Sequence, residues 1–436
     1  MPQRLSSSSD DFEPRFRDLL AGKREASLDV EDAVRAILAD VRRRGDAALF
    51  ELTARYDALE LTPETMRVSA DEIEAAYRAT APETLRALEL AHERITRHHE
   101  RQRPQDDRYT DAIGAELGSR WTAVESVGLY VPGGAASYPS SVLMNAVPAK
   151  VAGVERIAMV VPAMRGALNP LVLAAARIAG VGEIYRIGGA QAVAALAYGT
   201  QTIAPVAKIV GPGNAYVATA KRQVFGTVGI DMIAGPSEVL VIADGANDPD
   251  WIAADLLAQA EHDRAAQSIL LTDDADFADA VERAVERQLA RLSRQETARA
   301  SWDEFGAVIV VGDLLAEAPA LADRIAAEHL EIATDDPEAL FALIRNAGAA
   351  FLGRHTPEVI GDYVGGSNHV LPTARSARFS SGLSVLDFVK RTSILKLTAE
   401  ALRTLGPAAI ELARVEGLDA HGRSVAVRLN LAGDAG

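Results

Sequence analysis

The stretch VGLYVPGG at residues 127–134 introduces the pattern that decides the fold. It is a short apolar run that ends in proline and glycine, as a buried strand does before a loop. Similar β-branched runs follow at 157–162, 184–188 and 209–211, and helical patterns lie between them at 168–179, 190–198 and 215–225. Strands that alternate with helices of about 10–15 residues predict βαβ units and a parallel sheet.

The same alternation begins again further along the chain, with apolar runs at 239–243, 269–272, 308–311 and 330–334. The predicted fold class is therefore α/β, with two Rossmann-like parallel-sheet domains and small helical extensions at both ends. The expected division is an N-terminal arm at 1–25, a first α/β domain formed by 26–126 and 238–385, a second α/β domain at 127–237, and a C-terminal helical extension at 386–436.

The segments outside the sheets are predicted to be mainly helical. Residues 1–10 are expected to form a loose arm, and helical spacing then dominates from residue 11 to about 120, with one long helix from about 70 to 103. We expect these helices to pack on the sheet formed by residues 238–385. The adjacent His98 and His99 are expected to be surface or interface residues. The tail from about Thr392 is predicted to be helical and then polar.

Composition excludes several classes of protein. The 436 residues carry a formal net charge of −16, which argues against nucleic acid or an anionic membrane as a main partner. No apolar stretch reaches the roughly 18 residues of a membrane span, and the first residues lack the apolar region of a secretory signal. A cytoplasmic location is consistent with these features.

The chain contains no cysteine. Disulfides, thiolate zinc sites and iron–sulfur clusters are therefore excluded, and so is a thiol nucleophile. Any oxidation of an aldehyde to an acid by this protein has to activate water directly, because a thiohemiacetal cannot form.

Glycine and proline gather at the ends of the predicted strands, at 132–134, 188–189, 211–213 and 235–236. In an open parallel sheet the ligand lies beyond the carboxyl ends of the strands, where glycine lets the backbone approach it. Four such loops favour a dinucleotide or a phosphorylated ligand, although α/β loops commonly contain glycine and proline for turns alone. No complete Gly-x-Gly-x-x-Gly follows a strand, so an ordinary Rossmann mode of cofactor binding is not supported.

Two clusters of polar residues follow helical patterns. A helix predicted to begin with Asp248 as N-cap and Pro249 at its first position brings Gln259 and His262 to neighbouring positions, where both can face one metal ion. Such a pair is also typical of a satisfied polar helix edge. In the second cluster Glu328 ends a buried helical stripe at a helix-to-strand junction, and the next residue is His329. A partly buried Glu beside a His supplies two proton-transfer groups, whereas a helix-end His can simply interact with the helix dipole.

Two further clusters lie nearer the C-terminus. Asp362 is in the glycine-rich segment 361–369, which we expect to be irregular, and it is either a carboxylate ligand or a turn former. Glu416 and His421 lie in a short polar segment that is otherwise typical of a solvated tail. Together Gln259, His262, Asp362 and His421 offer only nitrogen and oxygen donors, which suits zinc, or manganese with less selectivity.

Over nearly its whole length the chain resembles the histidinol dehydrogenase family. The matching segments are 128–134, 188–192, 210–217, 234–239, 259–262, 327–330, 361–363, 368–373 and 416–421. One departure is His98, where family members often carry an aromatic residue before the histidine.

This resemblance implies a role for each matching residue. It implies that Glu328 and His329 are the proton-transfer pair and that Gln259, His262, Asp362 and His421 bind zinc, one ion per subunit. It further implies NAD contacts at Tyr130, Gln191 and Asn214, on the 127–237 domain. The implied substrate contacts are the four zinc ligands together with Ser237, His329 and Glu416.

The resemblance also implies an intertwined homodimer whose C-terminal segment reaches the partner's active site, so that Glu416 and His421 act across the interface. The implied activity is the NAD-dependent oxidation of L-histidinol through L-histidinal to L-histidine, at the end of histidine biosynthesis. In this hypothesis His329 takes the alcohol proton, Glu328 activates water to attack the bound aldehyde, and zinc orients the substrate.

Three alternatives remain at this point. Relatives that oxidise other polyfunctional alcohols share the fold, and Ser237 and Glu416 only favour histidinol. A zinc hydrolase with Glu328 as general base needs no nicotinamide, but the glycine-rich strand ends argue against it. A non-catalytic binding protein does not require the adjacent acid and base.

Overall fold

The computed structural model describes residues 1–22, 28–133, 138–233 and 235–431. The expected end of the N-terminal arm at residue 25 and the glycine at 134 lie outside the described residues. The chain forms two compact units. Unit 1 comprises Met1–Gln102 and Val124–Phe388, and unit 2 comprises Arg103–Ala123 and Val389–Gly436.

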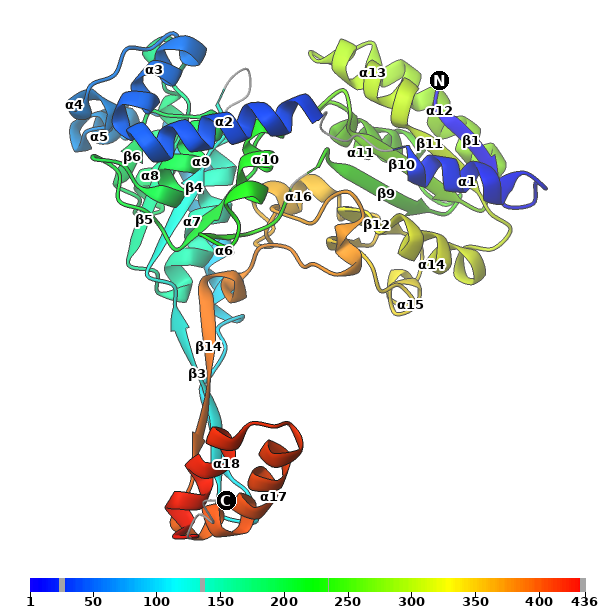
Figure 1. The fold of residues 1–436 in the computed structure, drawn as a ribbon. Coiled ribbons are helices and arrows are strands. Elements are labelled where there is room, and N and C mark those ends of the chain that lie inside the picture. The colour runs from blue at the N-terminus through cyan, green and yellow to red at the C-terminus, as the bar shows by residue number, and fades with distance from the viewer. Residues whose placement is uncertain (23–27, 134–137, 234, 432–436) are drawn as a thin grey trace. The chain divides into compact units, whose positions relative to one another are not determined.

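Unit 1 contains two parallel sheets with helices packed against them (Figure 1). The five-stranded sheet has the order β6-β5-β4-β7-β8, and it defines the β4 lobe. Its strands are β4 (Ser126–Tyr130), β5 (Arg156–Val160), β6 (Glu183–Tyr185), β7 (Lys208–Val210) and β8 (Gly229–Ile230). The connecting helices are α7 (Pro139–Ala152), α8 (Pro170–Ile178), α9 (Gly189–Tyr198) and α10 (Ala215–Val224). Strand order reverses between β4 and β7, which is the switch point where α/β proteins commonly bind ligands.

The six-stranded sheet has the order β1-β11-β10-β9-β12-β13, and it defines the β9 lobe. All its neighbouring strands are parallel, and its own switch point lies between β9 and β12. Its strands are β1 (Gln3–Ser6), β9 (Glu238–Ala243), β10 (Gln267–Thr272), β11 (Ala307–Val310), β12 (His329–Ala333) and β13 (Ala349–Leu352). The predictions of an α/β fold and of parallel sheets are confirmed.

The two faces of the β9-lobe sheet alternate along each strand, as the pleat requires. Val239 and Val241 of β9 pack with α11 (Pro249–Ala260), α12 (Ala275–Leu289) and α13 (Gln295–Phe305). Leu240 and Ile242 pack on the other face with α1 (Phe12–Ala21), α14 (Leu314–Ile325) and α15 (Pro337–Phe341). Both faces are therefore covered, which explains why β9 reads as one uninterrupted apolar run.

The expected loose N-terminal arm is wrong. Residues 3–6 form β1, which pairs with β11, and Leu5 is only 2% exposed. Phe16 of α1 is fully buried against the same sheet. A four-residue edge strand followed by serines is too short to show a periodic pattern, so it could not be predicted from the sequence.

The early helices were expected on the sheet formed by residues 238–385, and this is also wrong. They are α2 (Leu28–Arg44), α3 (Asp46–Asp57), α4 (Pro63–Met66), α5 (Ala70–Ala79) and α6 (Pro82–Glu100), and they pack in the β4 lobe. Val34, Leu38 and Val41 join the core of the β4 sheet, so residues 28–100 do not belong with 238–385. An apolar helical stripe specifies that a face is buried but not against which element.

The long helix predicted at 70–103 is two helices, because Pro82 begins a new one and its predecessor is extended. His99 is fully buried on α6, and its Nδ1 lies 2.7 Å from the Ile95 carbonyl oxygen. It is therefore buried within the chain and is not the surface or interface residue that we expected.

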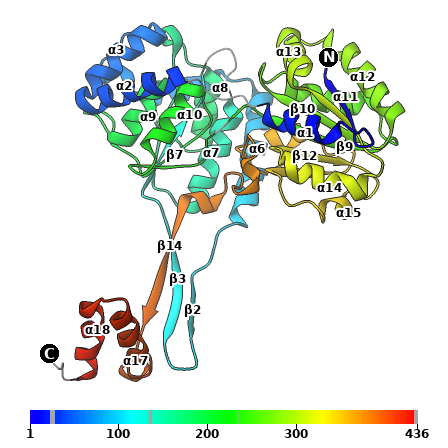
Figure 2. The same ribbon diagram turned by 45° about the vertical axis from the view of Figure 1, so that its right-hand side comes forward.

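Unit 2 is built on an antiparallel sheet of order β14-β3-β2, with β2 at Asp107–Thr110, β3 at Glu116–Ala123 and β14 at Val389–Lys396. The predicted helical start at Thr392 is wrong, because β14 pairs with β3 as far as Lys396. The helices α17 (Ala399–Val415) and α18 (Asp419–Ala426) follow, and Figure 2 shows them at the C-terminal end of the chain.

The remaining helical elements are short. They are α16 (Glu358–Tyr363) and the 3₁₀ helices η1 (Met164–Gly166), η2 (Ser376–Arg378), η3 (Val385–Phe388) and η4 (Val427–Leu429). Among the helices in the described ranges, none has both the length and the apolar character needed to cross a bilayer.

Candidate active site

Glu328 and His329 lie where α14 gives way to β12. The helix ends at Ile325, Ala326 adopts a left-handed conformation, and His329 is the first residue of β12. In the sheet His329 is paired with Val239 of β9 and Ala349 of β13, so Glu328 and His329 lie where the chain enters an interior strand. Glu328 is 5% exposed and His329 4% exposed. The predicted helix-to-strand junction is confirmed.

The start of β9 holds both side chains. Glu328 Oε2 accepts a hydrogen bond from the Glu238 backbone N–H at 3.1 Å, and the Ser237 side chain also bonds to its carboxyl. His329 Nδ1 lies 3.1 Å from the Glu238 carbonyl oxygen, to which it can donate a hydrogen bond. Among the described residues Nε2 of His329 has no hydrogen-bond partner, which leaves it available to a ligand.

Helix α16 brings two carboxylates to the same imidazole. Asp362 Oδ1 lies 3.6 Å from His329 Nε2, and Glu358 Oε2 lies 3.6 Å from Nδ1. Asp362 was expected in an irregular loop, but it lies one turn after Glu358 on a short helix. Gly361 permits this approach, because a Cβ there would lie 2.4 Å from Cε1 of Phe351 on β13.

His369 completes this side of the site, and sequence reasoning did not find it. Its Nδ1 lies 3.0 Å from the Asp362 carbonyl oxygen, and its Nε2 lies 3.3 Å from Oγ of Ser141 on α7. Asn368 Nδ2 donates to the Met144 carbonyl oxygen at 2.6 Å. The segment that follows α16 is thus held against α7 of the β4 lobe.

Burial and mutual charge set the protonation of this group. Burial raises the pKa of Glu328, and it raises the pKa of Glu358 to about 8. Burial alone would lower the pKa of His329, but Glu358 and Glu328 outweigh it, so that this pKa is raised well above its ordinary value. For Asp362 burial acts upward, but the close contact with His329 and the charges of the nearby histidines prevail and lower its pKa. The site therefore stabilises an imidazolium beside two buried glutamates whose pKa values are raised.

Gln259 and His262 lie at the end of α11. Asp248 caps this helix by accepting the Asp250 N–H at 2.9 Å, and Pro249 is its first residue, as predicted. Gln259 is 1% exposed, and within the described residues its Nε2 has no hydrogen-bond partner. His262 follows the helix end; its imidazole is crowded enough for loss of hydration to lower its pKa, and the Asp362 charge opposes that shift.

The donor set can be compared with what a metal ion requires. In the described part of the chain there is no group of three or more His, Cys, Asp or Glu side chains placed to hold a metal. The predicted ligands supply two of these types here, His262 and Asp362, together with the unpaired buried amide of Gln259. This set of nitrogen and oxygen donors fits zinc with one ligand still to be supplied. Glu416 and His421 belong to unit 2, where both are exposed on the α17–α18 pair.

The three predicted NAD residues lie around the switch point of the β4 lobe. The Tyr130 hydroxyl, at the end of β4, accepts the Gly189 N–H at 2.9 Å, and burial raises the pKa of Tyr130 to about 12. Gln191 is buried on the first turn of α9. Asn214 caps α10 by accepting the N–H groups of Tyr216 and Val217 at 3.1 and 3.2 Å, a role that fits a helix N-terminus facing an anion.

A buried ion pair shapes the loop after β7, and sequence reasoning missed it. Lys221 and Asp231 form this pair, and each also binds Gly211: Lys221 Nζ donates to its carbonyl oxygen at 3.0 Å, and Asp231 Oδ2 accepts its N–H at 2.8 Å. Gly211 has φ of 112°, and a Cβ there would lie 2.1 Å from the Tyr130 carbonyl oxygen. The loop needs glycine to pass so close to β4.

A cluster of charged side chains lies at the switch point of the β9 lobe. Arg354 binds both carboxylate oxygens of Asp244, each at 2.7 Å, and it binds Asp335 at 2.7 Å. Asp244 follows β9 and Asp335 follows β12, so this cluster lies at the carboxyl ends of the strands that flank the switch point, where a Rossmann-like sheet would hold a nucleotide. The geometry favours the β4 lobe for a dinucleotide.

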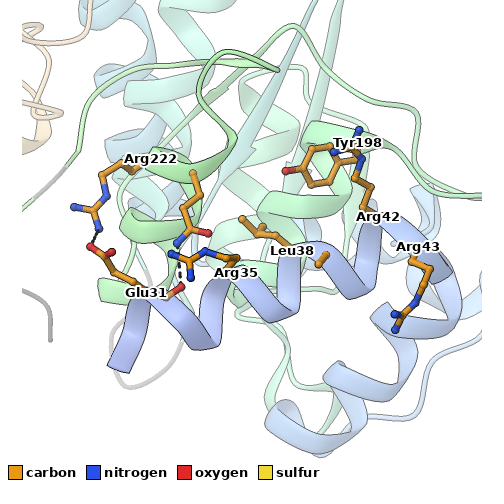
Figure 3. Close-up of a pocket in the computed structure, with 9 residues that line it drawn as sticks. Glu31, Arg35, Leu38, Arg42, Arg43, Tyr198 and Arg222 are labelled. Atoms are coloured by element: carbon orange, nitrogen blue, oxygen red, sulfur yellow. Dashed lines mark hydrogen bonds and ion pairs between the residues drawn. The ribbon is translucent and has the colours of Figure 1, made fainter. Parts of the chain in front are cut away.

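A cavity of about 560 Å³ lies elsewhere, between α2, α9 and α10 (Figure 3). Arginines dominate its lining, but Arg222 pairs with Glu31, Arg35 with Asp32 and Arg43 with Asp40. None of the predicted site residues lines it, so it is separate from the acid–base pair.

The fold and the site define an α/β protein of two parallel-sheet lobes with a buried Glu–His pair. A family model described as histidinol dehydrogenase matches residues 21–429. The chain is 73% identical over 426 residues to histidinol dehydrogenase of Agrobacterium fabrum, covering 98% of each chain, and 67% identical over 430 residues to that of Rhodospirillum rubrum, covering 99% of each. The solved structure of histidinol dehydrogenase from Elizabethkingia anophelis has a TM-score of 0.94 and 36% identity, with 98% of each chain covered. The chain belongs to the histidinol dehydrogenase family, and it is an NAD-dependent oxidoreductase of histidine biosynthesis.

Proposed function

We propose that this chain oxidises L-histidinol through enzyme-bound L-histidinal to L-histidine, and that Glu328 and His329 carry the proton transfers. The observation that carries the proposal is their shared position at the start of β12, buried and facing the carboxylate of Asp362. Bound NAD supplies the hydride acceptor in both oxidations.

His329 acts first, on the alcohol. In the neutral imidazole Nδ1 carries the proton that faces the Glu238 carbonyl, so the alcohol proton goes to Nε2 as hydride passes from the neighbouring carbon to NAD. The carboxyls of Glu358 and Glu328 stabilise the imidazolium that results. Hydrogen bonding at Nδ1 fixes the tautomer that exposes a basic Nε2.

Glu328 acts second, on water. Its carboxylate takes a proton from a water molecule, whose oxygen then attacks the aldehyde carbon to give the hydrate that is oxidised to the acid. Burial raises the pKa of Glu328, which makes its carboxylate a stronger base. A direct attack by water is required, because the chain has no cysteine.

We infer that Gln259, His262 and Asp362 hold a zinc ion together with His421 of the partner subunit. Bound zinc would orient the substrate and weakly polarise it. The same four residues, with Ser237, His329 and Glu416 of the partner subunit, would contact the substrate. The β9 lobe would then carry the metal and acid–base residues, and Tyr130, Gln191 and Asn214 of the β4 lobe would contact NAD.

An intertwined homodimer follows from this ligand set. Apolar side chains exposed on unit 2 support it, because surfaces of this kind are usually covered by a partner; they include Leu395, Leu405, Leu412, Val415, Leu418, Val427 and Leu431, each at least 40% exposed. A cytoplasmic location stays a prediction.

Complementation tests the shared site. Chains carrying His329→Asn and chains carrying His421→Asn should each be inactive, but co-expression should restore about a quarter of the wild-type activity, since half the dimers are mixed and each has one intact site. Activity is measured on the co-purified mixture, with each variant alone as control. If the mixture is as inactive as its components, His421 serves its own chain and the shared site is refuted.

The reaction itself is tested by its stoichiometry. Two NADH should form per L-histidinol consumed, and the activity should be lost with a chelator and restored by zinc. One NADH per substrate would mean that the aldehyde is released. If no NADH forms from L-histidinol, a different alcohol or a hydrolytic reaction would replace the proposal.

A further inference from the structure

Three elements each carry one of the proposed catalytic or metal-binding residues, and each also carries a carboxyl-bearing residue close to it. Helix α11 carries Gln259, strand β12 carries His329 and helix α16 carries Asp362. These carboxyl-bearing residues are Asp255 on α11, Glu331 on β12 and Glu358 on α16. The proposed mechanism uses neither Asp255 nor Glu331.

Glu331 connects the three elements. Its Oε1 accepts the backbone N–H of Glu358 at 2.5 Å, at the start of α16, and its carboxyl is hydrogen-bonded to that of Asp255. Side chains alternate along β12, so Glu331 faces the same side of the sheet as His329, the side that α11 covers. Glu331 is 3% exposed and Glu358 2% exposed.

A hydrogen bond between two carboxyl groups requires a proton, because two carboxylates have no hydrogen to share. Burial raises the pKa of Glu331 well above its ordinary value, and it raises that of Asp255 to about 6. One of the two carboxyl groups therefore keeps a proton and donates the hydrogen bond, and the other accepts it.

Among the described residues, the charged groups near this contact are mainly acidic. Glu358 and Asp362 face this region from α16, and Glu328 and His329 from the start of β12. The residues paired with Glu331 on the flanking strands are Val241 and Phe351, which carry no charge. His329, which lies beside Glu358, can carry a positive charge here.

We propose that Asp255 and Glu331 share one proton and thereby hold α11, β12 and α16 in register, which makes them positioning residues for Gln259, His329 and Asp362. The inference deepens the proposed function and rests on it for the roles of those three residues. Loss of the shared proton puts two repelling carboxylates between α11 and β12, and the site loosens as the pH rises.

Glu331→Gln tests the shared proton apart from the hydrogen-bonded contacts, because it can keep those contacts but removes the group that titrates. A glutamine can accept the Glu358 N–H through its oxygen and donate its amide to Asp255, with nothing to titrate. Glu331→Ala removes both bonds. We expect E331Q to lower kcat at neutral pH far less than E331A, and to move the alkaline decline of kcat upward by about one pH unit or more. E331A should also bind zinc more weakly than E331Q in a chelator competition without substrate.

The controls are Glu338→Gln, an exposed glutamate on α15, and Glu358→Gln, which removes the other carboxyl with a strongly raised pKa. E338Q should follow the wild-type pH profile. The proposal is overturned if E331Q keeps the wild-type alkaline decline, or if that decline disappears only in E358Q.

Thermal unfolding tests the shared proton without any substrate. A group whose folded-state pKa is raised contributes stability that is greatest at low pH and is lost as the pH rises from the ordinary carboxyl pKa to the folded one. The Tm of E331Q relative to wild type should therefore increase as the pH rises above about 4, the ordinary carboxyl pKa. A constant difference refutes the shared proton even if L-histidinol is not the substrate, whereas failure of the NADH assay alone refutes only the proposed function.

Discussion

Glu328→Gln should leave the oxidation of L-histidinol to the aldehyde largely intact while slowing oxidation of the aldehyde by about 10²–10⁴-fold, the usual contribution of a general base. The amide has nearly the same shape and can still accept the Glu238 N–H, so the local structure should persist. It cannot take a proton from water at neutral pH. His329, with Nε2 still available, should continue to deprotonate the alcohol.

The two half-reactions are separated by supplying L-histidinol and L-histidinal in turn and following NADH in a single turnover. E338Q is the matched control, since it makes the same chemical change on the surface of α15. In the wild type the aldehyde step should quicken as the pH rises through the raised pKa of Glu328, because the carboxylate is the active form. Equal slowing of both steps by Glu328→Gln would show that the division of roles is wrong.

Much of the fold is encoded locally, in features that a sequence displays. The strands β4, β5, β9 and β10 are short, buried on both faces and rich in β-branched residues, so they appear as apolar runs. The start of α11 carries its own capping residue, Asp248, and a proline. Glu328 ends an apolar stripe, which predicted a partly buried carboxyl beside His329.

Other features depend on contacts between distant segments. The four-residue β1 is specified by its pairing with β11, and the partner of α2 by the shape of the β4-lobe core. Glu331 looks like an ordinary strand residue until α11 and α16 are placed around it. Glu358, one turn before Asp362, was detectable only if residues 358–363 had been assigned to a helix.

The proposed site residues lie at opposite ends of the two Rossmann-like sheets. In the β4 lobe the proposed cofactor contacts lie beyond the carboxyl ends of β4 and β7, with Tyr130 at the first. In the β9 lobe the Asp244–Arg354–Asp335 cluster occupies the corresponding place, and Glu328 and His329 are at the amino end of β12. This difference explains why the glycine-rich loops that suggested a dinucleotide follow strands of the β4 lobe.

His262→Asn should abolish zinc binding and activity together. Asparagine is shorter than histidine and is a poor zinc ligand, so the remaining Gln259 and Asp362 would offer too few donors even with His421 of the partner subunit. Since loss of outer-shell partners alone lowers metal affinity by about 10–100-fold, loss of a ligand should exceed about 100-fold. Zinc affinity is measured by competition with a chelator and zinc content by elemental analysis after dialysis.

His355→Asn is the matched control for this experiment, because His355 lies in the same lobe, is exposed and packs its ring against Trp251 at 5.5 Å. It should keep both zinc and activity. Thermal unfolding should show the wild type and H355N losing stability in the chelator, with H262N unaffected, since a bound metal stabilises only a fold that holds it. If H262N retains tightly bound zinc, His262 is not a ligand; if it loses zinc and still forms two NADH per L-histidinol, the metal has no part in orienting the substrate.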